Sequence, residues 1–251
     1  MEGLGVVIFF AALGSVFSLT GGFLLLANKN LASKMVNYAT PFAAGALLAA
    51  AFIDLLGEAA EQDFAELALL WTLVGILIFF LLERFLHWFH HHHEHSDKKT
   101  DPKAALIIIG DTMHNFIDGI AIAAGFLTSF EVGVVVTIAV AAHEIPQEIG
   151  DFGLLLSKGL GRKKVVIVNL ISAFATILAA GVFYSLGRSV ELPEAIIIGL
   201  IAGFFIYIAV SDIIPSIHKN EEKKLAGVQT LMLLLGVIVV GLITVSLHSI
   251  I

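Results

Sequence analysis

The sequence contains no cysteine and little charge. Without Cys among its 251 residues, disulfides, thiolate metal ligands and thiol catalysis are all excluded. Charged residues make up 14% of the chain, whereas a soluble domain has roughly 25%. Hydrophobic residues make up 58%, and the mean hydropathy is +0.96. This composition predicts an integral membrane protein, and no nucleic-acid partner is expected.

Long apolar runs define the expected membrane segments. A helix needs about 20 apolar residues to cross the bilayer core, and such runs occur eight times. They are predicted to be helices, since backbone groups must be paired in lipid and no barrel-like alternation is present. We expect one all-α transmembrane domain over residues 1–251, an eight-helix bundle, with spans at about 4–27, 39–57, 66–89, 104–128, 131–156, 164–187, 194–217 and 226–250.

Basic residues predict the orientation. Of the 14 Lys and Arg residues, 13 lie at or after odd-numbered spans, and only Arg188 falls on the other side. Because basic residues collect in cytoplasmic loops, both termini are expected outside a cell membrane, plasma or inner. The cytoplasmic loop at 90–103 overlaps the His-rich stretch HWFHHHHEH at 87–95. That stretch predicts loose metal binding without a fixed geometry, and a polar loop without a ligand is the alternative.

Two spans share a short pattern. Residues from Gly45 read GALLAAAFIDLLG, and residues from Gly203 read GFFIYIAVSDIIP. Each pattern places an aspartate, Asp54 or Asp212, nine residues after the glycine and a helix breaker three residues later. The two spans run in opposite directions, so the pattern predicts inverted repeats around a midplane site, a common transporter plan. Chance similarity between two apolar helices is the alternative.

Carboxylates lie well inside predicted spans, among them Asp54, Asp111, Asp118, Glu144, Glu148, Asp151 and Asp212. A charged group at bilayer depth costs about 2.5–3.5 kcal/mol, so such residues indicate function. The one basic residue that accompanies them is Arg84, near the inner end of the third span. Neutralisation must therefore come from a metal ion, from protons or from a water-filled pathway.

Potential metal ligands form stripes on the fourth and fifth spans. Helical spacing places four of them on one face of the fourth span, namely Asp111, His114, Asn115 and Asp118. The fifth span carries His143, Glu144, Gln147, Glu148 and Asp151. Imidazole, carboxylate and amide donors together suit Zn²⁺, Fe²⁺, Mn²⁺, Co²⁺ or Cd²⁺, whereas Ca²⁺ and Mg²⁺ prefer oxygen ligands. The stripes predict a transition-metal site at the midplane between the two spans.

A proline and two glycines lie within or next to these stripes. Pro146 lies within the acidic stretch and is expected to kink the fifth span. Gly119 and Gly150 are expected to allow neighbouring helices to approach closely.

Two other functions fit parts of the pattern. An intramembrane zinc hydrolase would use HExxH, and His143-Glu144 begins that motif, but Gln147 occupies the position of the second His. A proton- or sodium-coupled transporter of small solutes also uses acidic midplane residues. It would need a pocket of mixed charge or broken-helix termini.

Two motifs carry a family resemblance. HNFIDG at 114–119 and HEIPQEIGD at 143–151, with eight spans and a His-rich loop, closely resemble the ZIP (Zrt/Irt-like) metal transporters over essentially the whole chain. The resemblance implies a 3+2+3 bundle, in which spans 1–3 and 6–8 are inverted repeats around the central pair, and a homodimer. It implies uptake of a divalent transition metal into the cytoplasm, with zinc first and iron, manganese or cadmium as alternatives. The metal is the cargo, and no prosthetic group is implied.

The resemblance also assigns ligands. The family's metal positions match His114, Asn115, Asp118, His143, Glu144 and Gln147. Gln147 departs from the His or carboxylate that often bridges two metals there, which argues against a two-metal centre, although Glu148 can partly compensate. The sixth-span position that carries a carboxylate in some members falls near Asn169 or Ser172. Pathway roles are expected for Asp111 and Asp151 beside the site and for Asp54 and Asp212 as gates.

Overall fold

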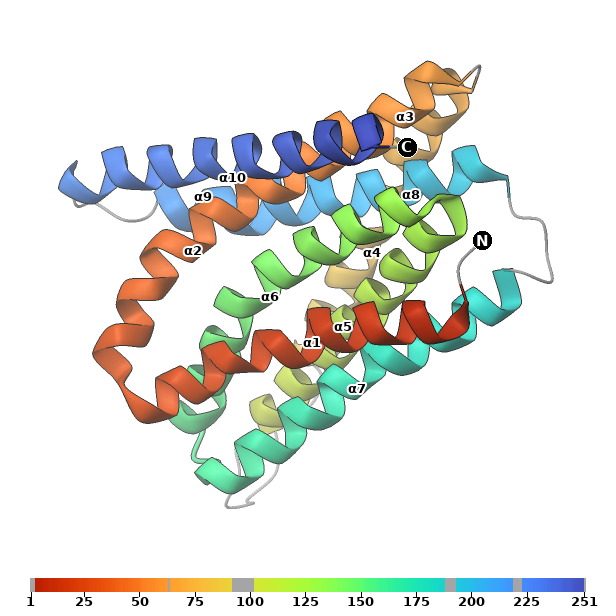
Figure 1. The fold of residues 1–251 in the computed structure, drawn as a ribbon. Coiled ribbons are helices and arrows are strands. Elements are labelled where there is room, and N and C mark those ends of the chain that lie inside the picture. The colour runs from red at the N-terminus through yellow and green to blue at the C-terminus, as the bar shows by residue number, and fades with distance from the viewer. Residues whose placement is uncertain (1–2, 63, 92–101, 188–192, 219–222, 251) are drawn as a thin grey trace.

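A computed structural model describes residues 3–62, 64–91, 102–187, 193–218 and 223–250, and every regular element in them is helical (Figure 1). The elements are α1 (Leu4–Ala27), α2 (Lys29–Ala49), η1 (Ala50–Leu55), α3 (Leu56–Glu61), α4 (Ala65–His91), α5 (Pro102–Thr128), α6 (Phe130–Ser157), α7 (Arg162–Gly187), α8 (Glu194–Tyr207), η2 (Ile208–Ile213), α9 (Ile214–His218) and α10 (Lys223–Ile250). Eight helical segments in these ranges are long and apolar enough to cross a membrane. The expected all-α fold with eight spans is confirmed.

The first two helices meet at a single residue, Asn28. Its side-chain oxygen accepts a hydrogen bond from the Leu31 N–H at 3.1 Å and so caps α2, which begins at Lys29 and continues through Pro41. The helix therefore starts ten residues before the span predicted at 39–57. Hydropathy detects only the part of a helix that matches the bilayer, so a polar first turn with a good N-cap escapes it.

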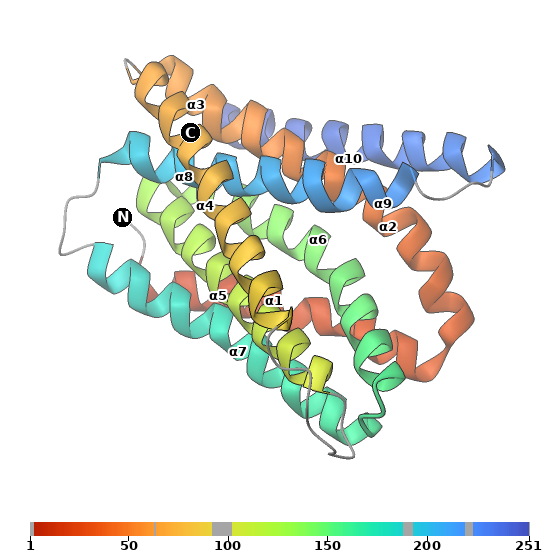
Figure 2. The ribbon, with the colours of Figure 1, turned by 180° about the vertical axis from the view of Figure 1, so that it is seen from behind.

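Four pairs of helices make the main packing contacts: α1 with α6, α5 with α7, α4 with α8, and α2 with α10. The two ligand-bearing helices, α5 and α6, also pack on each other and lie inside the bundle. Figure 2 shows α4 beginning beside α8 and ending near the start of α5. Large apolar side chains such as Leu69, Ile171 and Leu242 are exposed on the outer helices, as expected for surfaces that face lipid.

Glycines allow two of these close packings. An added Cβ at Gly119 would overlap the Thr176 carbonyl oxygen, so this glycine brings α5 against α7, as expected. The same expectation for Gly150 is wrong, since an added Cβ there would meet nothing within 4 Å. Gly150 lies about 200° around α6 from Glu148 and is exposed on the outer face of the helix. Gly21 allows α1 to pack closely against the Ile145 carbonyl of α6.

Two π-helices interrupt the second and seventh spans. Asp54 is the fifth residue of η1, and Asp212 is the fifth residue of η2. Single-turn π-helices within α-helices occur frequently at functional sites. Asp54 is 1% exposed, whereas the side chain of Asp212 lies outside the described part of the structure. Residues 92–101 and the side chains of 86–91 also lie outside it, and with them most of the His-rich tract.

Candidate metal centre

The fourth and fifth spans, α5 and α6, bring four side chains together. His114 and Asp118 come from α5, and His143 and Glu144 come from α6. One ligand atom from each side chain lies within 4.8 Å of the other three. We refer to these four residues as the His/carboxylate cluster. His114 and Asp118 belong to the first sequence motif, and His143 and Glu144 belong to the second. The four side chains meet because His114 and Asp118 are one helical turn apart on α5 and the antiparallel α6 places His143 and Glu144 opposite them.

The distances within the cluster fit a tetrahedral metal ion. The Nε2 atoms of His114 and His143 are 3.2 Å apart, and His143 Nε2 lies 3.3 Å from Asp118 Oδ2. His114 Nε2 lies 3.7 Å from Asp118 Oδ2 and 3.9 Å from Glu144 Oε1. Ligands about 2.0–2.2 Å from a tetrahedral Zn²⁺ are separated from one another by about 3.3–3.6 Å. The four side chains need little adjustment to share one ion.

The cluster has unmet hydrogen-bonding capacity. Both Glu144 carboxylate oxygens are buried without a hydrogen-bond partner among the described residues, and Asp118 Oδ2 has only ion-pair contacts, with His114 and His143. Leaving a charged acceptor unsatisfied in a buried position costs several kcal/mol, so a positive partner is needed. Two ionised carboxylates and two neutral imidazoles would balance the charge of one divalent cation. The arrangement can therefore hold such an ion without a nearby Lys or Arg.

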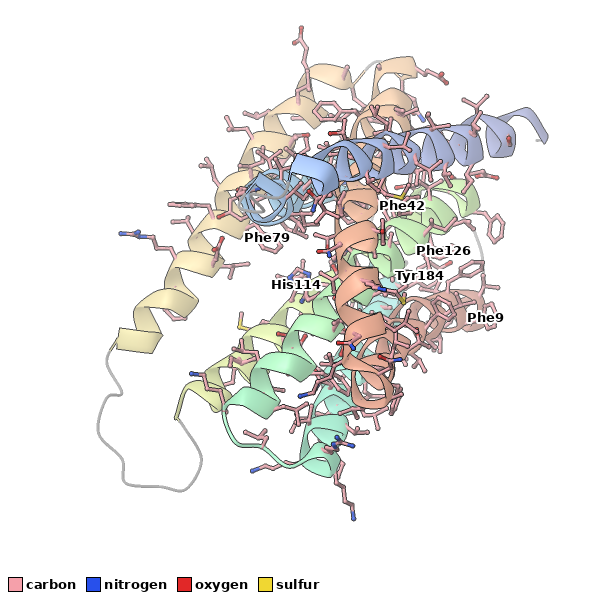
Figure 3. The ribbon with its side chains drawn as sticks, turned by 90° about the vertical axis from the view of Figure 1, so that its left-hand side faces the viewer. Phe9, Phe42, Phe79, His114, Phe126 and Tyr184 are labelled. Carbon is pink, nitrogen blue, oxygen red and sulfur yellow. The ribbon has the colours of Figure 1, made fainter. Side chains whose placement is uncertain are left out.

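Neighbouring groups orient both imidazoles. His143 Nδ1 lies 3.0 Å from the Ala139 carbonyl oxygen, and an N–H donated there leaves Nε2 free to bind a metal. The ring of Phe79 packs edge-on against His114, with ring centroids 5.9 Å apart. Figure 3 shows these two side chains near each other in the middle of the bundle. Neither Phe79 nor the Ala139 carbonyl was found by sequence reasoning, because nothing in an apolar run marks the residue that will face a ligand.

A cavity of about 390 Å³ adjoins the cluster at His114. Its lining comes from α4, α5 and α6 and includes Phe79, Leu82, Glu83, Gly110, Asp111, Met113, His114, Ile117, Gln147 and Asp151. Gln147 is half-buried there. Glu83, also missed as a site residue, accepts a hydrogen bond from the Tyr207 hydroxyl. The cavity gives water and ions access to one side of the cluster.

Asn115, which the family resemblance places among the ligands, takes part in hydrogen bonds with Asp111 and Thr176. Its Nδ2 donates to Asp111 Oδ1 at 3.1 Å, and its Oδ1 accepts from the Thr176 hydroxyl at 2.9 Å. On the sixth span, α7, the Ser172 hydroxyl donates to Thr112 Oγ1 at 3.1 Å. The bonds to Thr176 and Ser172 join α5 to α7.

The other predicted site residues lie around the cluster. Glu148 is 1% exposed, and neither of its carboxylate oxygens has a hydrogen-bond partner in the described ranges. Asn169 is also buried, and its Nδ2 donates to the Val165 carbonyl at 2.8 Å. Asp54, in η1, is outside the group of four, and Asp111 and Asp151 line the cavity.

In the described part of the chain, eight helices are long and apolar enough to cross a membrane, and two of them hold a buried cluster of His and carboxylate side chains. These features define a multi-span membrane protein with a centre suited to a divalent metal. The family model described as "ZIP Zinc transporter" matches residues 3–105 and 92–244. The chain therefore belongs to the ZIP zinc transporter family, a family of transporters and not of hydrolases or other enzymes.

Individual relatives agree with this assignment. Zinc transporter ZIP13 of Pongo abelii is 31% identical over 217 residues, which are 80% of this chain and 64% of that protein. Zinc transporter ZIP4 of Mus musculus is 38% identical over 120 residues, 47% of this chain and 18% of that protein. The ZIP13 homolog of Drosophila melanogaster is 27% identical over 279 aligned positions, 84% of this chain and 78% of that protein. The chain thus spans less than two thirds of the ZIP13 and ZIP4 proteins of Pongo abelii and Mus musculus.

Proposed function

We propose that this chain transports divalent transition-metal ions, zinc first, across a cell membrane into the cytoplasm. The observation that carries the proposal is the convergence of His114, Asp118, His143 and Glu144, whose ligand atoms lie within 4.8 Å of one another. Zinc is the first candidate for the transported metal because the relatives are named zinc transporters. Iron, manganese and cadmium are also candidates, since imidazole and carboxylate ligands accept all of them. The metal is cargo, and no prosthetic group is proposed.

The cavity supports a pathway between the cluster and the cytoplasm, while the direction of transport rests on the family resemblance. It opens beside His114 and is lined by Asp111 and Asp151, the proposed pathway residues. It lies towards the end of α4 and the start of α5, where the sequence places Arg84 and Lys103. Because basic residues collect on the cytoplasmic side, the cavity faces the cytoplasm in the proposed orientation. The start of α1 and the end of α10 lie at the other end of the bundle (Figure 1), in agreement with two external termini.

The packing supports the proposed inverted repeat. An inverted repeat would exchange α1 with α7, α2 with α8, α4 with α10, and α5 with α6. Under this exchange the contact between α1 and α6 corresponds to the contact between α7 and α5, and the contact between α2 and α10 corresponds to the contact between α8 and α4. An added Cβ at Gly45 would overlap the Leu233 carbonyl, and one at Gly203 would overlap the Thr72 carbonyl. The two π-helices also correspond, with Asp54 and Asp212 as proposed gate residues. A single transmembrane domain and a homodimer complete the proposal, the dimer from the family resemblance alone.

Uptake of metal into liposomes tests the proposed function. Purified protein is reconstituted in vesicles that contain a zinc-responsive dye, and uptake is measured with and without a pH gradient while cadmium, iron or manganese competes. We expect saturable zinc uptake that the competing metals reduce. A rate equal to that of protein-free vesicles for every metal would reject the proposal, since no cargo of the proposed class would remain.

Acid is expected to weaken zinc binding. The carboxylates and imidazoles of the cluster must be deprotonated to bind a metal, so protons compete with zinc. Each proton that zinc displaces lowers the apparent affinity by about tenfold per pH unit in the range where that ligand is protonated. The test is calorimetric titration with zinc at pH 7.5 and 5.5, with the histidines of 87–95 replaced by serine to remove their contribution. Equal affinities at the two pH values would contradict ligation by these groups.

A carboxylate at position 147 is expected to increase metal binding. Gln147 lines the cavity beside His114, and a neutral amide is a weaker ligand than a carboxylate. In Gln147→Glu we expect tighter zinc binding or a second zinc ion per chain, measured by titration in the same serine background. Gln62→Glu introduces the same charge at an exposed position outside the cavity and serves as the control. Identical isotherms for parent and Gln147→Glu would show that Gln147 does not limit the number of metals.

A further inference from the structure

A strongly basic segment connects α6 to α7. Residues 158–164 read KGLGRKK and contain four cations, Lys158, Arg162, Lys163 and Lys164. No Asp or Glu occurs from residue 152 to residue 190, so the sequence around the segment offers no charge to balance them. Positive charge repels a divalent metal ion, so transport of a metal does not explain this composition. Residues 158–164 are called the basic loop below.

Backbone hydrogen bonds fix the shape of the basic loop. Gly159 has a φ angle of +87°, which glycine adopts more readily than other residues. Its N–H donates to the Leu156 carbonyl oxygen at 3.1 Å, and the Leu160 N–H donates to the Leu155 carbonyl oxygen at 3.2 Å. This pair of bonds is the Schellman motif that ends many helices. Leu160 is 5% exposed and belongs to the same apolar cluster as Leu155, so the loop is anchored to the helix bundle.

The loop presents three of its cations at the start of the next helix. Arg162, Lys163 and Lys164 form the first turn of α7, and all three side chains are exposed. None of the three takes part in an ion pair within the described ranges of the chain. Cations in the first turn of a helix are disfavoured by the helix dipole. A bound anion would relieve both this interaction and the repulsion among the three side chains.

The loop also lies where phospholipid headgroups are found. The apolar segments on either side of it, Phe130–Leu156 and Arg162–Gly187, are each long enough to cross a membrane, so the residues between them lie at the membrane surface. Figure 1 shows the corner between α6 and α7 at the end of the bundle opposite the start of α1 and the end of α10. Basic residues collect on the cytoplasmic side, where anionic lipids give the membrane a negative surface potential.

We propose that the basic loop binds the phosphate groups of anionic phospholipids in the cytoplasmic leaflet. A lipid is the occupant that the position favours, because its phosphate is held at the depth at which the cations lie. The guanidinium of Arg162 can bind a phosphate through two parallel hydrogen bonds, and Lys163 and Lys164 add positive charge around it. The fixed backbone keeps these groups together, so little conformational entropy is lost on binding. The interaction does not depend on which metal the protein carries.

Lipid binding to the purified chain tests the proposal. The protein is kept in detergent and titrated with phosphatidylglycerol or with phosphatidylcholine, and native mass spectrometry counts the lipids bound per chain. We expect phosphatidylglycerol to bind in preference, and to bind less tightly as salt is added. Each basic residue near an anionic surface raises the binding constant about fivefold. The triple variant Arg162→Gln, Lys163→Gln, Lys164→Gln should therefore bind phosphatidylglycerol at least about tenfold more weakly than the parent.

A matched variant separates a site from a general effect of charge. The triple variant Lys29→Gln, Lys34→Gln, Arg84→Gln removes the same number of exposed cations from other helices and should bind phosphatidylglycerol as the parent does. If the basic-loop triple variant does not fold, the single variants Arg162→Gln and Lys163→Gln, each with an expected loss of about fivefold, decide the question.

Three results would overturn the proposal. The first is that the basic-loop variants keep the parent's affinity for phosphatidylglycerol, or that the matched variant loses as much affinity as they do. The second is equal binding of the two lipids by the parent. The third is that glycerol phosphate, which lacks acyl chains, competes as well as phosphatidylglycerol does, since the ligand would then be a soluble anion.

Discussion

Zinc uptake is expected to fall on the order of 100-fold in His143→Ala and in Asp118→Ala. Each substitution removes one of four ligands from a centre in which all ligand atoms lie within 4.8 Å of one another. Loss of even an outer partner of a metal ligand typically costs 10–100-fold in affinity or activity, and these residues are proposed as direct ligands. His143→Ala also leaves the carboxylates of Asp118 and Glu144 with one imidazole fewer to share the ion. Initial rates of uptake into zinc-dye vesicles measure the effect.

The control is Glu131→Ala, which removes a carboxylate from the first turn of α6, the helix that carries His143. It is expected to transport at the parent rate. Both ligand variants must elute as folded protein in size-exclusion chromatography, so that lost uptake does not reflect lost fold. Parent-like rates in folded His143→Ala and Asp118→Ala would disprove the assignment of the cluster as the transport site.

Substitution by alanine is expected to lower the stability of the protein at Gly119 and to raise it slightly at Gly150. Gly119→Ala places a methyl group on the Thr176 carbonyl oxygen, and backbone atoms of two packed helices cannot easily move apart. Overpacking of this kind costs about 1–3 kcal/mol. Gly150→Ala meets nothing within 4 Å, and alanine in an exposed helical position is more stable than glycine by about 0.5–1 kcal/mol. Thermal unfolding of the purified variants in detergent measures the difference.

The two glycine variants should also differ in transport. A displacement at Gly119 is expected to break the hydrogen bond between Thr176 and Asn115 and to shift His114 and Asp118, which lie on the same helix. Gly119→Ala is thus expected to lose uptake as well as stability, and Gly150→Ala to keep both. Equal melting temperatures for the two variants would mean that α5 and α7 do not pack closely at this glycine.

The fold was largely predictable because hydropathy and helix periodicity are local properties. Apolar runs such as 4–27 gave helix limits that match α1. The spacing of His114 and Asp118 indicated that their side chains share one helix face, which the structure bears out in their 3.7 Å separation. Features set by contact between helices were not predictable. Gly150 resembles Gly119 in sequence context, yet only the neighbouring helix decides which glycine is needed.

The contacts around the site were also not predictable from the sequence, because they depend on how the helices pack. Asn115 was grouped with the ligands by its position on the helix, while its hydrogen bond to Thr176 depends on the packing of α5 against α7. Phe79 and Glu83 reach the site from α4, 31 or more residues before His114. Nothing in its apolar run marks Phe79, and Glu83 was not assigned to the site although it is a carboxylate within the span predicted at 66–89. The π-helices at Asp54 and Asp212 were not predicted, although the repeated sequence pattern located both residues.

Zinc X-ray absorption of the loaded protein tests the central claim most directly, again with the histidines of 87–95 replaced by serine. For an ion bound by the His/carboxylate cluster we predict nitrogen and oxygen ligands at about 2.0–2.1 Å, with outer-shell scattering from two imidazoles that is halved in His143→Ala. A first shell of six oxygens without imidazole scattering, unchanged in His143→Ala, would contradict the claim that these four side chains bind the transported metal.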